Sequence, residues 1–312
     1  MEKLAVSSSP HIKAPMTTSK IMTQVLIALI PAGIAATVIF GGRALILIGF
    51  CVAFSVIWEK LFSVVTKRKD TTDDLSAVVT GLLLAYNLPV TIPLWMAGIG
   101  TFVAIIIVKQ LFGGIGQNFA NPAITGRIVL MLSFPSAMTT WAEPFYYSAK
   151  DVVTGATPLV TGDATYKELF LGTIGGSLGE TCSLALIIGG IYLMARNIIK
   201  PYAPAAFLGT IMVFSFIAGK DPIYQLLSGG IILAAFFMIT DYVTAPVTDI
   251  GKVIFGIGCG VITCVIRFYG GKAEGASYAI LLMNILVPYI DMVTSSTPFG
   301  AKKAEKIKEG EK

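Results

Sequence analysis

The sequence predicts an all-α integral membrane protein of about ten transmembrane helices, in two inverted five-helix repeats that include short or broken helices. The first observation is composition. Hydrophobic residues make up 55% of the 312 residues and charged residues only 13%, about half of the roughly 25% found in an average soluble domain. So few charges cannot cover a soluble globule of this size. The second observation is a series of apolar runs, and the third is the uneven placement of basic residues between them.

A bilayer-spanning helix needs about 20 apolar residues. Eight runs approach or exceed this length: residues 21–40, 44–65, 92–111, 178–195, 203–218, 223–240, 253–268 and 276–290. Two further runs, residues 75–88 and 122–134, are apolar but short. The first of these would be only about 21 Å long at 1.5 Å per residue, less than a hydrocarbon core of about 30 Å.

Basic residues predict the orientation. With the N-terminus in the cytoplasm, sixteen of the 23 basic residues fall on the inner side and six on the outer side, while Arg127 lies within a span. The inner group includes Lys67–Lys69, Lys109 and the lysines of the C-terminal tail, and the outer group includes Arg43 and Arg267. Because positive charge favours the cytoplasmic side, we expect both termini inside.

The spans divide the chain into five regions. We expect a cytoplasmic segment (residues 1–20), a first five-helix repeat (21–134), an extracytoplasmic loop (135–177), a second five-helix repeat (178–293) and a basic cytoplasmic tail (294–312). An odd number of crossings in each half makes the second repeat enter from the opposite side. Short helices leave backbone groups at membrane depth, where protein must bury them or a ligand site must use them. The alternative is a misplaced boundary.

Rare residues exclude several kinds of site. His11 is the single histidine, and no pair of the four cysteines has CxxC spacing, so we predict no metal site and no catalytic side chain. Redox chemistry in this chain would therefore require an organic cofactor. Nucleic-acid binding is not expected, because the basic clusters lie beside the membrane.

The long loop contains the sequence Asp151-Val-Val-Thr154-Gly155-Ala156-Thr157-Pro158. By itself, this sequence is typical of a polar turn. However, it is the polar centre of a long loop in a hydrophobic chain, and small residues leave the Thr157 hydroxyl open. A modifying enzyme needs such an accessible acceptor, because its pocket must close around the hydroxyl.

This motif matches the pattern Asp-x-x-Ser/Thr-Gly-Ala-Ser/Thr for covalent FMN attachment, with Thr154 where serine is common. The chain resembles the D subunit of the Rnf electron-transport complexes and its paralogue, the B subunit of the sodium-pumping NADH:quinone reductase. The resemblance extends to four other segments: residues 113–127, 176–181, 241–248 and 274–288. Its length, without a longer N-terminal extension, favours the Rnf subunit.

The resemblance implies a membrane flavoprotein subunit of a ferredoxin:NAD⁺ oxidoreductase that couples electron flow to Na⁺ or H⁺ transport across a prokaryotic cytoplasmic membrane. A flavin transferase would join FMN through its phosphate to Thr157, on the outer side of the membrane. A second flavin, riboflavin, could be held noncovalently between the spans. The implied partners are the other complex subunits, including an extracytoplasmic flavoprotein subunit, and membrane lipid.

Four polar residues are candidates for flavin contacts. Arg127 lies in a short span and could contact a flavin phosphate or ring carbonyl, or could pair with a carboxylate. Asn118 and Asn121 precede Pro122, where the next backbone amides could bind an anion or could simply begin a helix. Glu180 is predicted to open the sixth span, where a carboxylate also suits a helix N-terminus.

Asp241, Thr244 and Asp249 are ion-path candidates. The two carboxylates flank a stretch rich in threonine and carbonyl oxygens, which suit Na⁺, although a cytoplasmic helix cap explains them as well. Two other kinds of protein remain open: a channel or secondary transporter without a cofactor, and a scaffold that anchors redox partners. A covalently bound flavin would distinguish the flavoprotein subunit from both of these alternatives.

Overall fold

Helices make up most of the residues that the structure describes. The computed structural model describes residues 16–68, 70–148, 154–155, 162, 164–270 and 275–295. Within these residues the strands are two short segments, β1 (Trp141–Ala142) and β2 (Thr154–Gly155), which pair antiparallel. The all-α prediction is therefore confirmed.

The first half contains five apolar segments. They are α1 (Thr18–Phe40), α2 (Gly42–Thr66), α3 (Ser76–Tyr86), α4 (Leu94–Phe102) continuing as the π-helix η2 (Val103–Gln110), and α5 (Pro122–Ser133). Gly41 separates the first two helices with a φ of 73°, in the left-handed region that favours glycine. The short 3₁₀ helix η1 (Thr72–Asp74) precedes α3.

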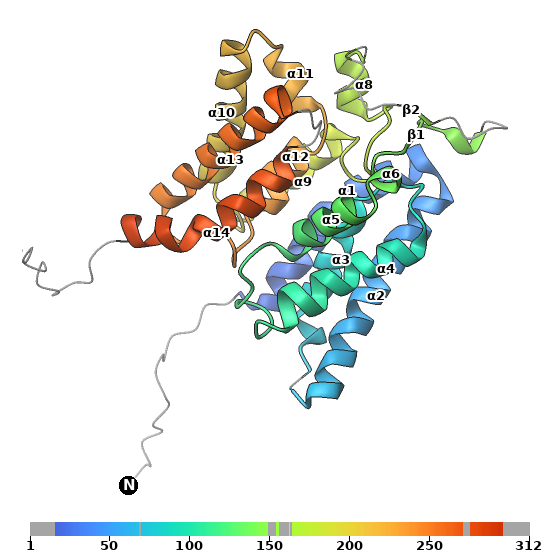
Figure 1. Cartoon of the computed structure of the whole chain (residues 1–312), viewed down its shortest axis with the longest axis vertical. Coiled ribbons are helices and arrows are strands. Elements are labelled where there is room, and N and C mark those ends of the chain that lie inside the picture. Colours follow the sequence, from blue (N-terminus) through green and yellow to red (C-terminus); the bar gives the residue numbers. More distant parts are fainter. Residues whose placement is uncertain are drawn as a thin grey trace, which may run out of the picture.

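The second half follows a similar order. Its elements are α9 (Ser183–Ala195), α10 (Tyr202–Ile217), α11 (Pro222–Leu227), α12 (Ile231–Leu233) continuing as the π-helix η4 (Ala234–Met238), α13 (Asp249–Tyr269) and α14 (Ala276–Thr294). Between the halves lie α6 (Pro135–Met138), β1, the 3₁₀ helix η3 (Tyr146–Ser148), β2 and α8 (Tyr166–Leu171). Figure 1 shows the two halves side by side, with α8, β1 and β2 at one end.

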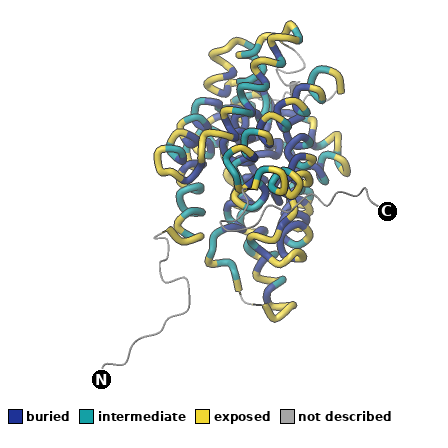
Figure 2. The backbone as a smooth tube through the Cα atoms, turned by 90° about the vertical axis from the view of Figure 1, so that its left-hand side faces the viewer, coloured by how far each residue is buried: buried dark blue, intermediate teal, exposed yellow. Residues whose placement is uncertain are grey.

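The class of membrane protein follows from helix length and surface. Among the described residues, four helices (α1, α2, α13 and α14) are long and apolar enough to cross a membrane, and five shorter helices are also apolar. Large apolar side chains face outward along them; Ile30, Ile34 and Val38 of α1 are 53%, 60% and 59% exposed. The exposed outer surfaces in Figure 2 surround a buried centre. Contact with lipid accounts for these exposed apolar surfaces, because contact with water would be unfavourable for them.

Two predicted spans are wrong in detail. The sixth span begins at Ser183 and not at residue 178, because residues 178–182 form a turn that pairs with the first half. The eighth is not one helix over residues 223–240 but is interrupted at Ser228–Gly230, between α11 and α12. The short third span is confirmed: α3 has 11 residues, about 16 Å at 1.5 Å per residue.

The two halves meet through equivalent elements. The first helix of each half packs together (α1 with α9), and so does the last (α5 with α14). Beyond α3, the carbonyls of Tyr86 and Leu88 accept hydrogen bonds from the amides of Gly179 and Leu178. The backbone groups left by the short helix are therefore satisfied by protein, as membrane depth requires. These contacts suit a pseudo-two-fold arrangement, although the repeat boundaries remain a prediction.

We expect Gly189→Ala to destabilise the contact between the halves. A Cβ at Gly189 would collide with the carbonyl oxygen of Ala28 in α1 and lie 3.0 Å from the Phe237 ring. Overpacking of this kind costs about 1–3 kcal/mol. The thermal transition of the purified chain in detergent measures the loss.

The matched control is Gly209→Ala in α10, where nothing outside the local helix backbone lies within 4 Å of the new Cβ. Alanine at such a helical position should be neutral or should stabilise the chain by up to about 1 kcal/mol. Equal transitions for the two variants would contradict the close packing of α1 on α9.

Candidate functional site

The flavin motif begins on a short ribbon. Thr154 and Gly155 form β2, and they pair with Ala142 and Trp141 of β1. Asp151, Ala156 and Thr157 lie outside the described residues, so the position of the acceptor hydroxyl is not given. The structure does place the backbone that leads into it, at one end of the molecule (Figure 1).

The base of this loop is attached to the first half. The amide of Phe145 donates to the carbonyl of Ile39 at 2.8 Å, and the Tyr147 hydroxyl donates to the carbonyl of Val38 at 2.8 Å. Both acceptors belong to the last turn of α1, where carbonyls lack helical partners. Trp141 is buried. Through β1 and residues 145–147, the backbone of Thr154 and Gly155 is therefore connected to the last turn of α1.

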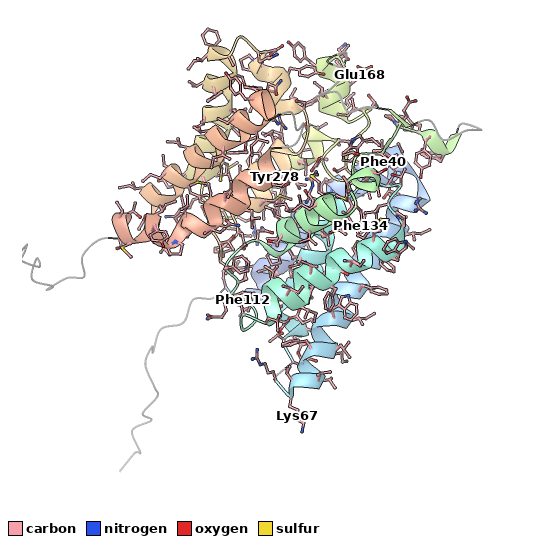
Figure 3. The ribbon with its side chains drawn as sticks, in the orientation of Figure 1. Phe40, Lys67, Phe112, Phe134, Glu168 and Tyr278 are labelled. Carbon is pink, nitrogen blue, oxygen red and sulfur yellow. The ribbon has the colours of Figure 1, made fainter. Side chains whose placement is uncertain are left out.

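The loop lies far from the predicted inner charges. Figure 3 shows Lys67, from the inner cluster, and Glu168 of α8, from the loop region, at opposite ends of the molecule. Glu168 closes a capping box with Thr165 at the start of α8, and the hydrogen bonds from Thr165 lower the pKa of the Glu168 carboxyl. The arrangement is compatible with the predicted orientation, which itself depends on the sequence.

Arg127 lies at the centre of a buried polar cluster. One guanidinium nitrogen donates to Glu180 Oε1 at 2.5 Å and to Asn87 Oδ1 at 2.6 Å, and the other donates to Ser177 Oγ at 3.4 Å. The side chains of Arg127 and Glu180 are each 3% exposed. The cluster joins α3 and α5 of the first half to the turn before α9.

This pairing matches one of the two interpretations of Arg127. A carboxylate partner was the alternative to a flavin contact for Arg127, and the ion pair accounts for its charge. Glu180 does not open a helix, since α9 begins at Ser183, so its prediction as a helix-opening carboxylate is wrong. Gly230 permits the pair, because a Cβ there would lie 2.6 Å from Glu180 Oε1. A flavin role for either residue remains a prediction.

A second guanidinium lies beside this cluster. Arg267, in the last turn of α13, donates to the carbonyls of Gln225 and Ser228, each at 3.0 Å. Arg267 and Arg127 both line a small cavity, together with Gly230. Arg267 was expected only as an outer-side charge; the structure shows that it also holds the carbonyls exposed by the break between α11 and α12.

The largest set of predicted residues meets at a cavity between the halves. Its volume is about 90 Å³, and its walls come from α1, α3, η2, α5, α9 and η4. Apolar side chains predominate, with polar groups at the edges, among them Ser76, Thr80, Asn118, Asn121 and Asp241. We refer to it as the inter-half pocket. It brings together residues that the sequence could relate only by resemblance.

The two asparagines have local roles in this structure. Asn121 accepts hydrogen bonds from the amides of Ala123 and Ile124, at 3.1 and 3.2 Å, and so caps α5. These amides are therefore already occupied, and the helix-start reading accounts for them. Asn118 donates to the carbonyl of Ala120 at 3.0 Å. Both residues still line the inter-half pocket, so a ligand contact stays a prediction.

Sequence reasoning missed a buried ion pair. Lys109 Nζ donates to the two carboxylate oxygens of Glu59, at 3.0 and 2.9 Å, and the side chains are 3% and 0% exposed. Lys109 was expected as an inner-side charge, and the structure adds that it is buried beside Glu59. The sequence did contain a signal for this pair, because Lys109 lies near the end of one apolar run and Glu59 lies inside another. Charges buried among apolar residues require partners of opposite charge.

The ion-path candidates fall into two environments. Thr244 Oγ1 donates to Asp241 Oδ2 at 2.9 Å, and Asp241 lines the inter-half pocket. Burial raises the pKa of the Asp241 carboxyl, while hydrogen bonds from Thr244 and Val243 oppose that shift. Asp249 instead forms an exposed ion pair with Lys200, at 2.8 Å, and is the first residue of α13. The position of Asp249 is therefore that of an ordinary carboxylate at the N-terminus of a helix.

Among the described residues, no group of three or more His, Cys, Asp or Glu side chains is placed to hold a metal ion. Cys51, Cys259 and Cys264 are buried and Cys182 is half-buried, all as free thiols. Their positions suit small core residues.

These features define a polytopic α-helical membrane protein with a buried polar interior between two halves. The chain belongs to the NQR2, RnfD, RnfE family, whose model matches residues 5–300. The match confirms the resemblance drawn from the sequence motifs.

Curated relatives match over nearly the full length. The chain is 47% identical to the D subunit of the Na⁺-translocating ferredoxin:NAD⁺ oxidoreductase complex of Acetobacterium woodii, over 97% of each chain. It is 41% identical to the D subunit of the proton-translocating ferredoxin:NAD⁺ oxidoreductase complex of Clostridium ljungdahlii, over 96% of each chain. The D subunit of the ion-translocating oxidoreductase complex of Ectopseudomonas mendocina is 35% identical, over 95% of this chain and 96% of the relative.

Proposed function

We propose that this protein is the membrane flavoprotein subunit of an ion-translocating ferredoxin:NAD⁺ oxidoreductase and carries FMN covalently on Thr157. The observation that carries the proposal is the similarity over nearly the full length to relatives named as the D subunit of such complexes. The flavinylation motif at residues 151–157 supports the cofactor. The chain acts as one subunit of the complex, and the other subunits are its partners.

The residues of the loop suit their proposed task. A flavin transferase would transfer FMN from FAD to the Thr157 hydroxyl, forming a phosphoester as the pyrophosphate bond breaks and AMP leaves. The bound flavin would then supply one- and two-electron transfer. The pairing of β2 with β1 and the attachment to α1 would hold the cofactor near the membrane surface. The excess of basic residues at the other end supports an extracytoplasmic position, where a flavoprotein subunit would deliver electrons.

The inter-half pocket is the proposed site of a noncovalent riboflavin. An isoalloxazine ring has flat apolar faces and a polar edge of nitrogen and oxygen atoms. The pocket offers the same combination, with Val79, Leu83 and Phe236 on its walls and Thr80 and Asn118 among its polar groups. The chemistry of these residues therefore suits the group, and binding would require the pocket, about 90 Å³ in this structure, to widen around the ring. They would exclude water from the ring and orient its edge by hydrogen bonds.

Ion movement is proposed to depend on residues near the inner end of this pocket. Asp241 faces the pocket, whereas Asp249 is paired and exposed. We therefore expect Asp241→Asn to lower electron-driven ion uptake by the complex by about tenfold or more, and Asp249→Asn to leave it nearly unchanged. A tenfold change corresponds to about 1.4 kcal/mol. Uptake into vesicles measures both variants; equal rates would remove Asp241 from the path.

The function is tested on the whole complex in inverted vesicles. Reduced ferredoxin and NAD⁺ should drive uptake of Na⁺ or H⁺, and uptake should stop without the electron donor. If uptake proceeds equally without donor, the chain is a cofactor-free transporter. If electron flow and uptake both continue in a complex that lacks the chain, the chain is neither a carrier nor a coupling subunit.

A further inference from the structure

The buried ion pair of Glu59 and Lys109 lies directly behind the inter-half pocket. Lys109 Nζ contacts Glu59 on one side and Ser76 Oγ, at 2.5 Å, on the other. Lys109 and Ser76 are both part of the pocket wall, whereas Glu59 is not among the described residues that form it. The lysine member of the pair therefore belongs to the pocket wall, and its ammonium is held there by Glu59 and Ser76.

Glu59 is held in place from several elements. Its carboxylate accepts hydrogen bonds from Thr71 at 2.6 Å and from Gln110 at 2.8 Å, in addition to those from Lys109. Lys109 and Gln110 are consecutive residues of the π-helix η2, and both reach the same carboxylate. Single π-helical stretches within α-helices are frequent at functional sites. The wider turn thus concentrates several donors on one buried acid.

Stability alone does not account for this arrangement. Replacing a buried ion pair by apolar residues of similar volume is often neutral or stabilising, because burial removes the hydration of both charges. A pair at a pocket wall is in a different situation, since the charge of the member nearer the pocket acts on any occupant at low dielectric. Of the described residues that line this pocket, Lys109 is the basic one, and Asp241 is the acidic one.

We propose that Lys109 is the positioning charge that sets the reduction potential of the flavin bound in the inter-half pocket, with Glu59 and Ser76 holding its ammonium in place. The inference depends on the proposed noncovalent flavin. The ring would take up two electrons from the redox groups of the complex and one proton from water, which would leave one negative charge on it. The ammonium favours that reduced form, and the Glu59 carboxylate moderates the effect.

The sign of the effect is testable with a matched set of variants. Lys109→Gln removes the positive charge and should shift the potential of the noncovalent flavin downward. Glu59→Gln leaves the ammonium without its counter-charge and should shift it upward. Each shift should change the ratio of reduced to oxidised flavin at a fixed potential at least tenfold, about 30 mV for a two-electron couple. The double variant Glu59→Gln/Lys109→Gln should lie close to the unchanged chain.

The measurement uses the full chain with Thr157→Ala in the background, so that covalent flavin does not contribute. Flavin released by denaturation is first counted, and the bound flavin is then titrated with dithionite and followed by absorbance. A chain that releases no flavin would overturn the proposed riboflavin site. A chain that holds flavin, but in which the single variants leave the potential unchanged or move it in the same direction, would overturn only the role of Lys109. If Lys109→Gln does not fold, Glu59→Gln and Lys109→Arg carry the test, with an upward shift and a retained potential expected.

Discussion

Thr157→Ala is expected to abolish covalent flavin and to lower electron transfer from ferredoxin to NAD⁺ by the assembled complex at least a hundredfold. The reason is chemical: the phosphoester requires the Thr157 hydroxyl, and an electron path through the outer flavin would lose its carrier. In-gel fluorescence of the denatured chain reports attachment, and donor-dependent NAD⁺ reduction reports turnover.

Two conservative changes serve as controls for this prediction. Thr157→Ser keeps a hydroxyl at the acceptor position, and Thr154→Ser restores the commoner residue of the motif. Both should retain fluorescence and turnover within a few-fold. An alanine variant that still fluoresces at the mass of this chain would show that the flavin is attached elsewhere.

Arg127→Ala is expected to be among the most destabilising single changes in the described part of the chain. It leaves Glu180, which is 3% exposed, as a buried carboxylate without its ionic partner. Breaking a buried pair from one side costs about 3–5 kcal/mol. Glu180→Ala should have a comparable effect, because Arg127 then loses its carboxylate. The thermal transition and the yield of assembled complex measure both changes.

The double change provides the sharper control. Arg127→Met/Glu180→Met removes both charges and fills much of the volume, so it should be less destabilising than either alanine variant alone. Lys200→Gln breaks the exposed pair with Asp249 and should leave the transition nearly unchanged. Additive losses in the double variant would mean that the two side chains act independently, contrary to the 2.5 Å contact between them.

Much of the architecture was accessible from the sequence because lipid imposes simple constraints. Apolar length predicted nearly all the spans, and the short run at residues 75–88 correctly predicted a short helix, α3. The break at Ser228–Gly230 was missed because the sequence stays apolar on both sides of it. The late start of α9 was missed for a related reason, since the pairing of Gly179 with Tyr86 is a contact between distant segments.

The candidate site was less predictable. The motif around Thr157 is local, so the sequence could reveal it by resemblance. The partner of Arg127 lies 53 residues away, and the partner of Lys109 lies 50 residues away, and no periodicity relates such positions. The inter-half pocket likewise needs six elements from both halves. The sequence could therefore indicate a local motif such as that around Thr157. The ion pairs between distant segments could be identified only from the structure.

The most direct test of the account is the intact mass of the purified chain, produced together with an active flavin transferase. We expect an increase of one FMN less one water, which proteolysis assigns to the peptide that contains Thr157. The same preparation of the Thr157→Ala chain should have the unmodified mass. A wild-type chain at its unmodified mass, or an FMN on a different peptide, would contradict the central claim.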